Sequence, residues 1–221
     1  MLQLADSFFP AGTYTMSNGL EALFKQKKLG ADELGSLIRT YMERQIGPAD
    51  VAALGSAHDC AMQADLKGVL KVDSLSYSMK LVEEVRSALA RSGAQMVRTV
   101  SALAPGSKVL SGYGAAIKRD KATGVYPVAL AVSCAALGIP KQKAGAVMLY
   151  SFCVGMAGAA LRLGAIDHVG AQMILHGLKP AIGRAVQENI DRPASEMWQF
   201  APGIDSWQMA HERLDSKMFI T

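Results

Sequence analysis

The chain has 221 residues, of which 50% are hydrophobic and 6% aromatic, so it is long enough to form one large helical domain or two small ones. Its net charge of +4 comes from basic residues interspersed with carboxylates, which argues against nucleic-acid binding through a basic stripe. The cysteines are far apart, and Gln3 and Asp6 interrupt the start of the chain, so neither a disulfide framework nor a signal peptide is expected. Together these features predict a cytoplasmic protein with reduced thiols.

The first residues predict a loop rather than a long helix. Residues 1–16 read MLQLADSFFPAGTYTM, in which a brief apolar turn gives way to Asp, Ser, Pro and Gly. This composition predicts a short helix followed by a structured loop. Asn18 and Glu21 have the spacing of a capping box, which predicts the start of a helix that ends at Gly30.

Apolar residues at helical spacing, with polar caps before them and Gly or Pro after them, predict the other helices. No segment shows the period-two alternation of a strand. The expected helices are one opened by Asp32 and ended by Gly47-Pro48, one from Val51 to about Ala64, one opened by Asp73 or Ser74 that is interrupted at Gly93 and ends before Pro105, a short one after Ser107, one from Pro127 to Leu137, one from Asp167 to Pro180, one from about Ala181 to Asn189, and one from Asp205 through Met218.

One stretch, Ala144 to Leu161, contains no charged residue and is bracketed by Pro140 and Gly164. A membrane span and the central helix of a bundle both fit this pattern. Because Ala and Gly dominate the stretch, the core helix is favoured over a bilayer span, which draws more on Leu, Ile, Phe and Val. The sequence therefore predicts an all-α fold, residues 1–221 forming a single-domain bundle of about ten helices around this central apolar helix.

The spacing patterns of known catalytic and metal sites are missing from the sequence. It contains no HExxH, CxxC, G-x-x-x-x-G-K-[ST] or G-x-S-x-G. Asp6, Ser7 and His211 have the composition of a catalytic triad, but no spacing supports one. We therefore expect no catalytic residue, cofactor or metal site, with a weakly held metal at a subunit interface left open. Four histidines are expected at surface or capping positions: His58, His168, His176 and His211.

The opening residues nevertheless carry a specific resemblance. LQLADSFFPAGTYTMSNGLEALF resembles the N-terminal pattern LLQLxDxxxPxGGFxYSxGLE of the UreF family of urease accessory proteins, with Thr13 and Met16 as departures from it. Weaker similarities follow in the family's order. They are Arg91-Ser92-Gly93, the stretch from Ala159 to Gly164 with Gln172, and His211-Glu212 with Met218-Phe219.

This resemblance implies an all-helical, non-enzymatic assembly factor. Such a protein would form a homodimer, join a second urease accessory protein of the D/H type and recruit a nickel-binding GTPase of the G type. The complex would then deliver nickel to apo-urease. Neither a nucleic acid nor a membrane is expected as a partner, and the chain itself would need no cofactor.

Two segments are expected to contact these partners. The loop from Phe8 to Met16 carries clustered aromatic residues, and the tail 198–221 holds both tryptophans. Deletion of residues 207–221 is accordingly expected to leave the fold intact and to abolish partner capture. Alternatively, Phe8 and Phe9 plug the end of the bundle, and the tail folds back on its own domain. The predicted partner-binding residues are Phe8, Phe9, Pro10, Tyr14, Met16, Trp207, His211, Glu212, Met218 and Phe219.

Two other classes of protein remain as alternatives. The first is a small helical membrane protein with a hairpin at 128–161, formed by residues 128–139 and 144–161, although the first of these segments is short for a span. The second is a helical enzyme with an unrecognised site, although no spacing of residues in the sequence supports one. Its site would be built from Asp6, Arg98, Lys141 and His211.

Overall fold

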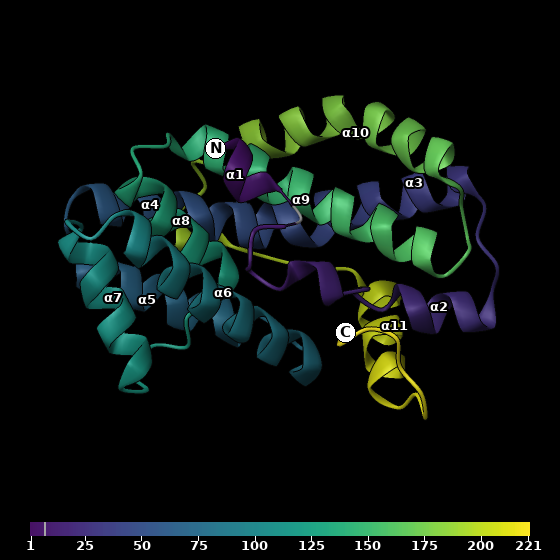
Figure 1. Cartoon of the computed structure of the whole chain (residues 1–221), viewed down its shortest axis with the longest axis horizontal. Coiled ribbons are helices and arrows are strands. Elements are labelled where there is room, and N and C mark those ends of the chain that lie inside the picture. Colours follow the sequence, from purple (N-terminus) through teal and green to yellow (C-terminus); the bar gives the residue numbers. More distant parts are fainter. Residues whose placement is uncertain (7) are drawn as a thin grey trace.

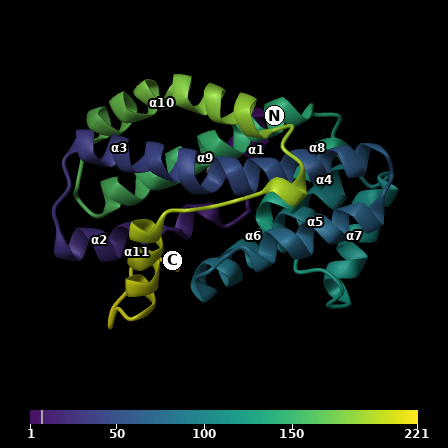
Figure 2. The same ribbon diagram turned by 180° about the vertical axis from the view of Figure 1, so that it is seen from behind.

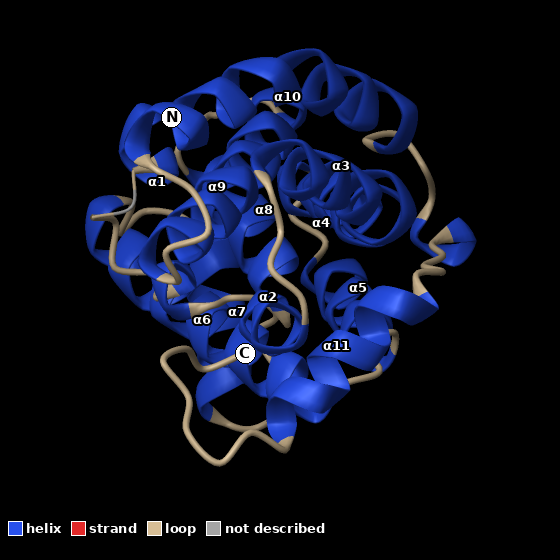
Figure 3. Cartoon of the chain, turned by 90° about the vertical axis from the view of Figure 1, so that its right-hand side faces the viewer, coloured by secondary structure: helices blue, strands red, loops and turns tan. Residues whose placement is uncertain are grey.

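The computed structural model describes residues 1–6 and 8–221, and this part of the chain is built from helices and loops without a strand (Figure 3). The predicted all-α fold is confirmed. The α-helices are α1 (Leu2–Ala5), α2 (Leu20–Gln26), α3 (Ala31–Tyr41), α4 (Ala52–Met62), α5 (Leu66–Ser78), α6 (Glu83–Leu103), α7 (Lys108–Lys118), α8 (Tyr126–Ala136), α9 (Lys141–Arg162), α10 (His168–Asn189) and α11 (Pro202–Glu212). Three further segments are the 3₁₀ turns η1 (Thr13–Thr15) and η3 (Ala194–Glu196) and the π-helix η2 (Met42–Val51).

Helix α9 is the predicted central helix, and it lies between α10 on one side and α4 and α8 on the other (Figure 1). Pro140 caps its start, and Gly164 follows its end with a left-handed φ of 72°. By length and composition α9 could cross a membrane, but 56% of its most apolar window is buried inside the chain. This packing supports the core helix over the membrane hairpin, because neighbouring helices occupy the surface that lipid would need.

The predicted break at Gly47-Pro48 is wrong. Helices α3 and α4 are joined end to end by the π-helix η2, and Pro48 lies inside it. Proline has no N–H to donate, and the wider π turn shifts the hydrogen-bond register around the missing bond so that the helix continues. The change of register also turns one face of η2 toward the interior, where Gln45 and Asp50 are buried.

Two more predicted interruptions are also wrong. Gly93 lies in the middle of the continuous helix α6, where a Cβ would come within 1.9 Å of the Gly124 carbonyl oxygen. Its function is therefore to let the loop before α8 approach the helix backbone. Pro180 lies inside α10, which runs on to Asn189 as an arched outer helix (Figure 1). The exposed position of Pro180 lets its ring face solvent, and the helix bends instead of ending.

Several polar residues that were predicted as helix caps have other roles. Asp167, by contrast, caps α10 as predicted, and its carboxylate accepts a hydrogen bond from Gly170 N at 2.7 Å. Asn18 adopts a left-handed φ of 52° and Gly19 caps α2 in its place, so the predicted capping box with Glu21 does not form. Asp73 is buried within α5. The remaining corrections are that α3 is capped by Gly30 rather than Asp32, that α5 begins after Asp65, and that α11 begins at Pro202 rather than Asp205 and ends at Glu212 rather than Met218.

The close approach at Gly93 makes a testable prediction. Gly93→Ala should lower the free energy of unfolding by about 2–3 kcal/mol, since the new methyl group meets rigid backbone on the neighbouring loop. Gly183→Ala in α10 is the matched control, because nothing lies within 4 Å of its added Cβ, and it should be neutral or stabilise by about 0.5–1 kcal/mol. Urea denaturation of both variants measures the difference, and equal midpoints would contradict the steric argument.

Candidate functional site

The C-terminal segment of the chain meets residues 12–21 at one place, which we call the terminal junction and define as residues 12–21 and 211–221. In Figure 2 the C-terminus lies next to α11 and close to α2. Main-chain hydrogen bonds pair the two segments in the manner of adjacent strands, so neither segment is a loose end. These main-chain bonds run from Ile220 N to Thr15 O at 2.9 Å and from Ser17 N to Thr221 O at 2.9 Å. Asn18 N also donates to the side-chain hydroxyl of Thr221 at 3.2 Å.

A buried histidine connects the junction to α6. His211 is fully buried, and its Nε2 lies 3.2 Å from Glu21 Oε2 while its Nδ1 lies 2.7 Å from Glu84 Oε2. A carboxylate only accepts hydrogen bonds, so each ring nitrogen of His211 is in position to donate one. Lys217 completes the row through its Nζ, 2.7 Å from Glu84 Oε1. The histidine thereby joins three segments that are far apart in sequence.

Glu21 also holds the end of the chain directly. Its carboxylate accepts from the backbone N–H of Met218 at 3.0 Å and of Phe219 at 3.2 Å. Burial acts to raise the pKa of Glu21, but these hydrogen bonds and the contact with His211 outweigh it and lower the pKa below its ordinary value. The pKa of Glu84 is lowered in the same way, against burial, by Lys217 and His211. Both carboxylates are therefore ionised anchors at neutral pH.

Arg162, at the end of α9, clamps the junction from the opposite side. Its guanidinium lies over the ring of Tyr14 at 4.0 Å and over the ring of Phe219 at 4.3 Å. Its Nη2 also donates to the carbonyl oxygen of Tyr14 at 2.7 Å. Stacking an arginine between aromatic rings, one from each end of the chain, gives a rigid arrangement because the planar guanidinium loses little freedom.

The junction divides the predicted partner-binding residues into two groups. Phe9, Met16, His211 and Phe219 are buried inside the chain, so their prediction as surface contacts is corrected: each packs in the core or bonds within the junction. Phe9 thus fills the bundle end, while the neighbouring Phe8 is 93% exposed. The predicted residues that retain exposed or partly exposed surface are Phe8, Pro10, Tyr14, Trp207, Glu212 and Met218.

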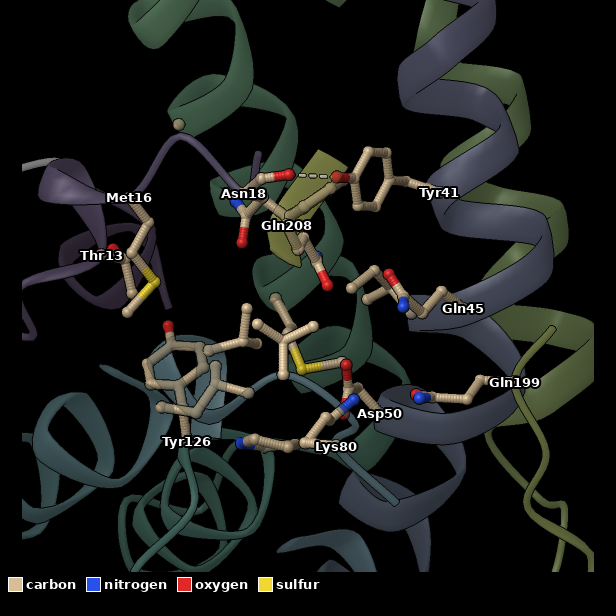
Figure 4. Close-up of a pocket in the computed structure, with 18 of the residues that line it drawn as sticks. Thr13, Met16, Asn18, Tyr41, Gln45, Asp50, Lys80, Tyr126, Gln199 and Gln208 are labelled. Atoms are coloured by element: carbon tan, nitrogen blue, oxygen red, sulfur yellow. Dashed lines mark hydrogen bonds and ion pairs between the residues drawn. The ribbon is translucent and has the colours of Figure 1, made fainter. Parts of the chain in front are cut away.

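Beside the junction lies a cavity of about 80 Å³ (Figure 4). Lys80 and Asp50 face each other at its base with 2.7 Å between Nζ and Oδ1, and both are almost completely buried. Burial raises the pKa of Asp205. The hydrogen bond that Gln45 donates to its carboxylate at 2.9 Å and the nearby charge of Lys80 act in the opposite direction but do not outweigh burial. The Oε1 atom of Gln199 has no hydrogen-bond partner among the described residues. The cavity can therefore hydrogen-bond a polar group, and its charged lining residues Lys80 and Asp50 are paired with each other.

The cysteines offer little reactivity. Cys134 and Cys153 are buried, Cys60 is partly buried, and all three are free thiols. Burial raises the pKa of Cys134 and of Cys153 to about 12, and it raises the pKa of Cys60 as well. Thiols of this kind are uncharged at neutral pH, and the thiolate is the form that attacks substrates and binds metals.

The residues of the hypothetical enzyme site have separate environments. Lys141 pairs with Asp59 at 2.6 Å and Asp191 at 2.8 Å, and His211 is held in the junction. Arg98 lines a groove between α6 and α7. Asp6 accepts from Phe8 N at 2.8 Å, and Ser7 of the triad-like set lies outside the described residues. The structure thus gives no support to this alternative.

Sequence reasoning missed the buried charges. Nothing in the sequence marks Lys80 and Asp50 as buried, because charged residues are seldom buried and this pair joins segments far apart in the chain. The burial of Asp73 could have been predicted, since it lies four residues after Val69 and three before Ser76, on the buried face of α5. A charged residue in that register indicates a buried acceptor rather than a helix start.

Comparison with known proteins gives one consistent family along the whole chain. The family model UreF matches residues 29–179. The urease accessory protein UreF of Trichodesmium erythraeum is 27% identical over 224 residues, which cover 99% of this chain and 94% of the relative. Urease accessory protein UreF 1 of Brucella melitensis is 30% identical over 221 residues, which cover 100% of this chain and 91% of the relative. The urease accessory protein UreF of Bacillus sp. (strain TB-90) is 26% identical over 222 residues, which cover 100% of this chain and 97% of the relative.

The family match covers more than half of the chain, and the relatives extend over the rest of it, including both segments of the terminal junction. The N-terminal pattern that suggested the family lies at that junction, where Ser17, Gly19 and Glu21 all contact C-terminal residues. The chain belongs to the UreF family of urease accessory proteins.

Proposed function

We propose that this chain is a non-catalytic scaffold in urease maturation. As a homodimer in the cytoplasm, it joins a second accessory protein of the D/H type and recruits a nickel-carrying GTPase of the G type for nickel insertion into apo-urease. Family membership over the whole chain is the observation that carries the proposal. The chemistry of the described residues agrees with it, because the buried charges are paired within the fold and the thiols are uncharged.

The terminal junction, together with Phe8 in the loop before it, supplies the surface for the first of these partners. Phe8 and Met218 are 93% and 61% exposed, and Tyr14, stacked on Arg162, is 50% exposed. Exposed aromatic and methionine side chains on a rigid support are typical of interface anchors. Because Arg162 and His211 fix both segments of the junction, Tyr14 and Met218 are presented without a large ordering cost.

Reconstitution from purified components tests the role. Apo-urease, nickel, GTP and the two other accessory proteins are combined with or without this chain, and urease activity is followed. We expect activity to depend on the chain, and we expect the chain alone to hydrolyse no GTP. Equal activation without the chain, or failure of the chain to join either accessory protein in size-exclusion chromatography, would contradict the proposal.

Point substitutions test the surface better than a truncation. Deleting residues 207–221 would remove His211 and Phe219 from the core, so the earlier expectation that this deletion leaves the fold intact is not supported. Phe8→Ser and Met218→Ser keep the core and should weaken capture of the D/H-type protein about tenfold or more. Met62→Ser, at a residue that is 65% exposed on α4, is the control and should bind normally by biolayer interferometry.

A further inference from the structure

Helix α6 runs from the terminal junction toward α7, which lies at the end of the bundle away from α2 (Figure 1). An open groove of about 720 Å³ lies between these two helices. The short turn Ala104–Ser107 joins the two helices. The groove is separate from the cavity beside the terminal junction, and Arg91 at one end of it also borders the junction residues Glu212 and Lys217. Its volume alone fits either a small ligand or part of a peptide, so the shape and charge of its lining decide between them.

The floor of the groove is lined mainly by small side chains and is largely apolar. Small residues line it from both helices, among them Ala94 and Ser101 on α6 and Gly114 and Ala115 on α7. Val97 is buried beneath them, with its Cγ1 3.2 Å from the position of a Cβ on Gly114. Because these side chains are short, the backbone of a third helix could lie close to both α6 and α7.

The rims of the groove carry positive charge. Arg91 and Arg98 on α6 and Lys118 on α7 are exposed, and none of them forms an ion pair with another described residue. No Asp or Glu is among the described residues that line the groove. A ligand that fits this surface must therefore bring negative charge along its flanks, with an apolar or small-residue face between them.

The chemistry favours a protein ligand over a nucleic acid. Single-stranded nucleic acids bind where aromatic side chains stack on bases, and no aromatic residue is among the described residues of the groove. A helix offers both a flat face for the small-residue floor and carboxylates at its edges. We propose that the α6–α7 groove binds an acidic amphipathic helix of a protein partner, with carboxylates on Arg98 and Lys118.

This proposal does not rest on the role in urease maturation, and it can be tested with the full-length chain alone. The probe is a fluorescein-labelled helical peptide with glutamates flanking an alanine and leucine stripe. The same peptide with every glutamate replaced by glutamine is its neutral counterpart. Binding is measured by fluorescence anisotropy at low and high salt, and the site is located from shifts in the amide NMR signals of Ala94 and Ala115.

Charge-reversal variants make the test specific. Arg98→Glu/Lys118→Glu should weaken binding of the acidic peptide at least about tenfold, because two favourable contacts become repulsive. Lys143→Glu/Arg184→Glu changes the net charge equally at exposed sites on α9 and α10, and it should bind like the unmodified chain. Both variants are expected to fold, because all four side chains are exposed, and circular dichroism checks this.

Each outcome decides the matter. Saturable, salt-sensitive binding of the acidic peptide alone, lost in the groove variant and kept in the control, supports the proposal. It is overturned if the neutral peptide binds equally, if both variants lose binding equally, or if the NMR shifts lie outside α6 and α7. A short uridine oligonucleotide that binds the groove more tightly than the peptide would also overturn it, in favour of a nucleic-acid site.

Discussion

Replacing Asp73 with alanine is expected to lower the free energy of unfolding by about 3–5 kcal/mol, a large fraction of the stability of a single domain. Asp73 is 1% exposed, and its carboxylate accepts five hydrogen bonds. One comes from the Tyr113 hydroxyl of α7 at 2.6 Å, and the others come from the loop that precedes α8. The side chain therefore fixes α5, α7 and the start of α8 to one another.

The expected loss is large because several of the donors stay buried when the acceptor is removed. The Tyr113 hydroxyl and the N–H groups of Gly124 and Val125 are buried, whereas the two donors of Thr123 are partly buried and can turn to water. Each orphaned buried donor costs about 1–3 kcal/mol. The same loop passes Gly93, so its displacement would also disturb the packing of α6.

Denaturant unfolding followed by circular dichroism measures this effect. Asp65→Ala on the same helix is the control, because it removes only an N-cap that accepts from Gly68 N at 2.9 Å, for an expected loss of about 1 kcal/mol. Asp73→Asn should fall between the two, since the amide keeps one acceptor and turns a donor toward other donors. An Asp73→Ala variant no less stable than Asp65→Ala would show that the loop is held by other contacts.

Acid should open the terminal junction before it unfolds the bundle. The folded-state pKa values of Glu21 and Glu84 lie below the ordinary value of 4.5. A carboxyl group with a lowered folded pKa contributes stability above its unfolded pKa and loses that contribution as the pH falls through the folded value. The two carboxylates therefore contribute their full stabilisation of the junction above about pH 4.5, and this contribution decreases progressively below it.

Glu21→Gln separates this carboxylate from the others. At neutral pH it should cost about 2–3 kcal/mol, because the amide replaces a buried ionised acceptor that faces Met218, Phe219 and His211. It should also flatten the dependence of the junction's stability on pH below about pH 4.5, because the carboxylate with the lowered pKa is gone. Amide hydrogen exchange at residues 218–220 reports the opening directly.

Glu33→Gln is the matched control for this experiment. The pKa of Glu33 is also lowered, by Lys27 and by the Gly30 N–H, but its side chain is half exposed and lies outside the junction. Exchange at residues 218–220 should be unchanged in this variant at every pH. Faster exchange there in Glu33→Gln, or a pH profile of Glu21→Gln that matches the unmodified chain, would refute the role assigned to Glu21.

Some of the site could be predicted from sequence, and some could not. Phe8 and Phe9 are adjacent and chemically identical, yet one is 93% exposed and the other 8%. The composition of the loop gives no means to separate them, because the difference depends on which side chain faces the bundle. His211 and Glu212 present the same problem, since only the partners supplied by α2 and α6 make the histidine buried.

The sequence by itself determined the helical class, the central helix α9 and the family. Apolar periodicity, an uncharged stretch of small residues and a specific N-terminal pattern are local features that need no knowledge of distant contacts. Tertiary structure alone decided that α3 and α4 are continuous through Pro48, that Gly93 admits a loop, and that residues 12–21 pair with the C-terminal segment. The continuity depends on the π-helical register of η2. The other two depend on contacts between residues far apart in sequence, and such contacts override local propensity because burial and hydrogen bonding outweigh it.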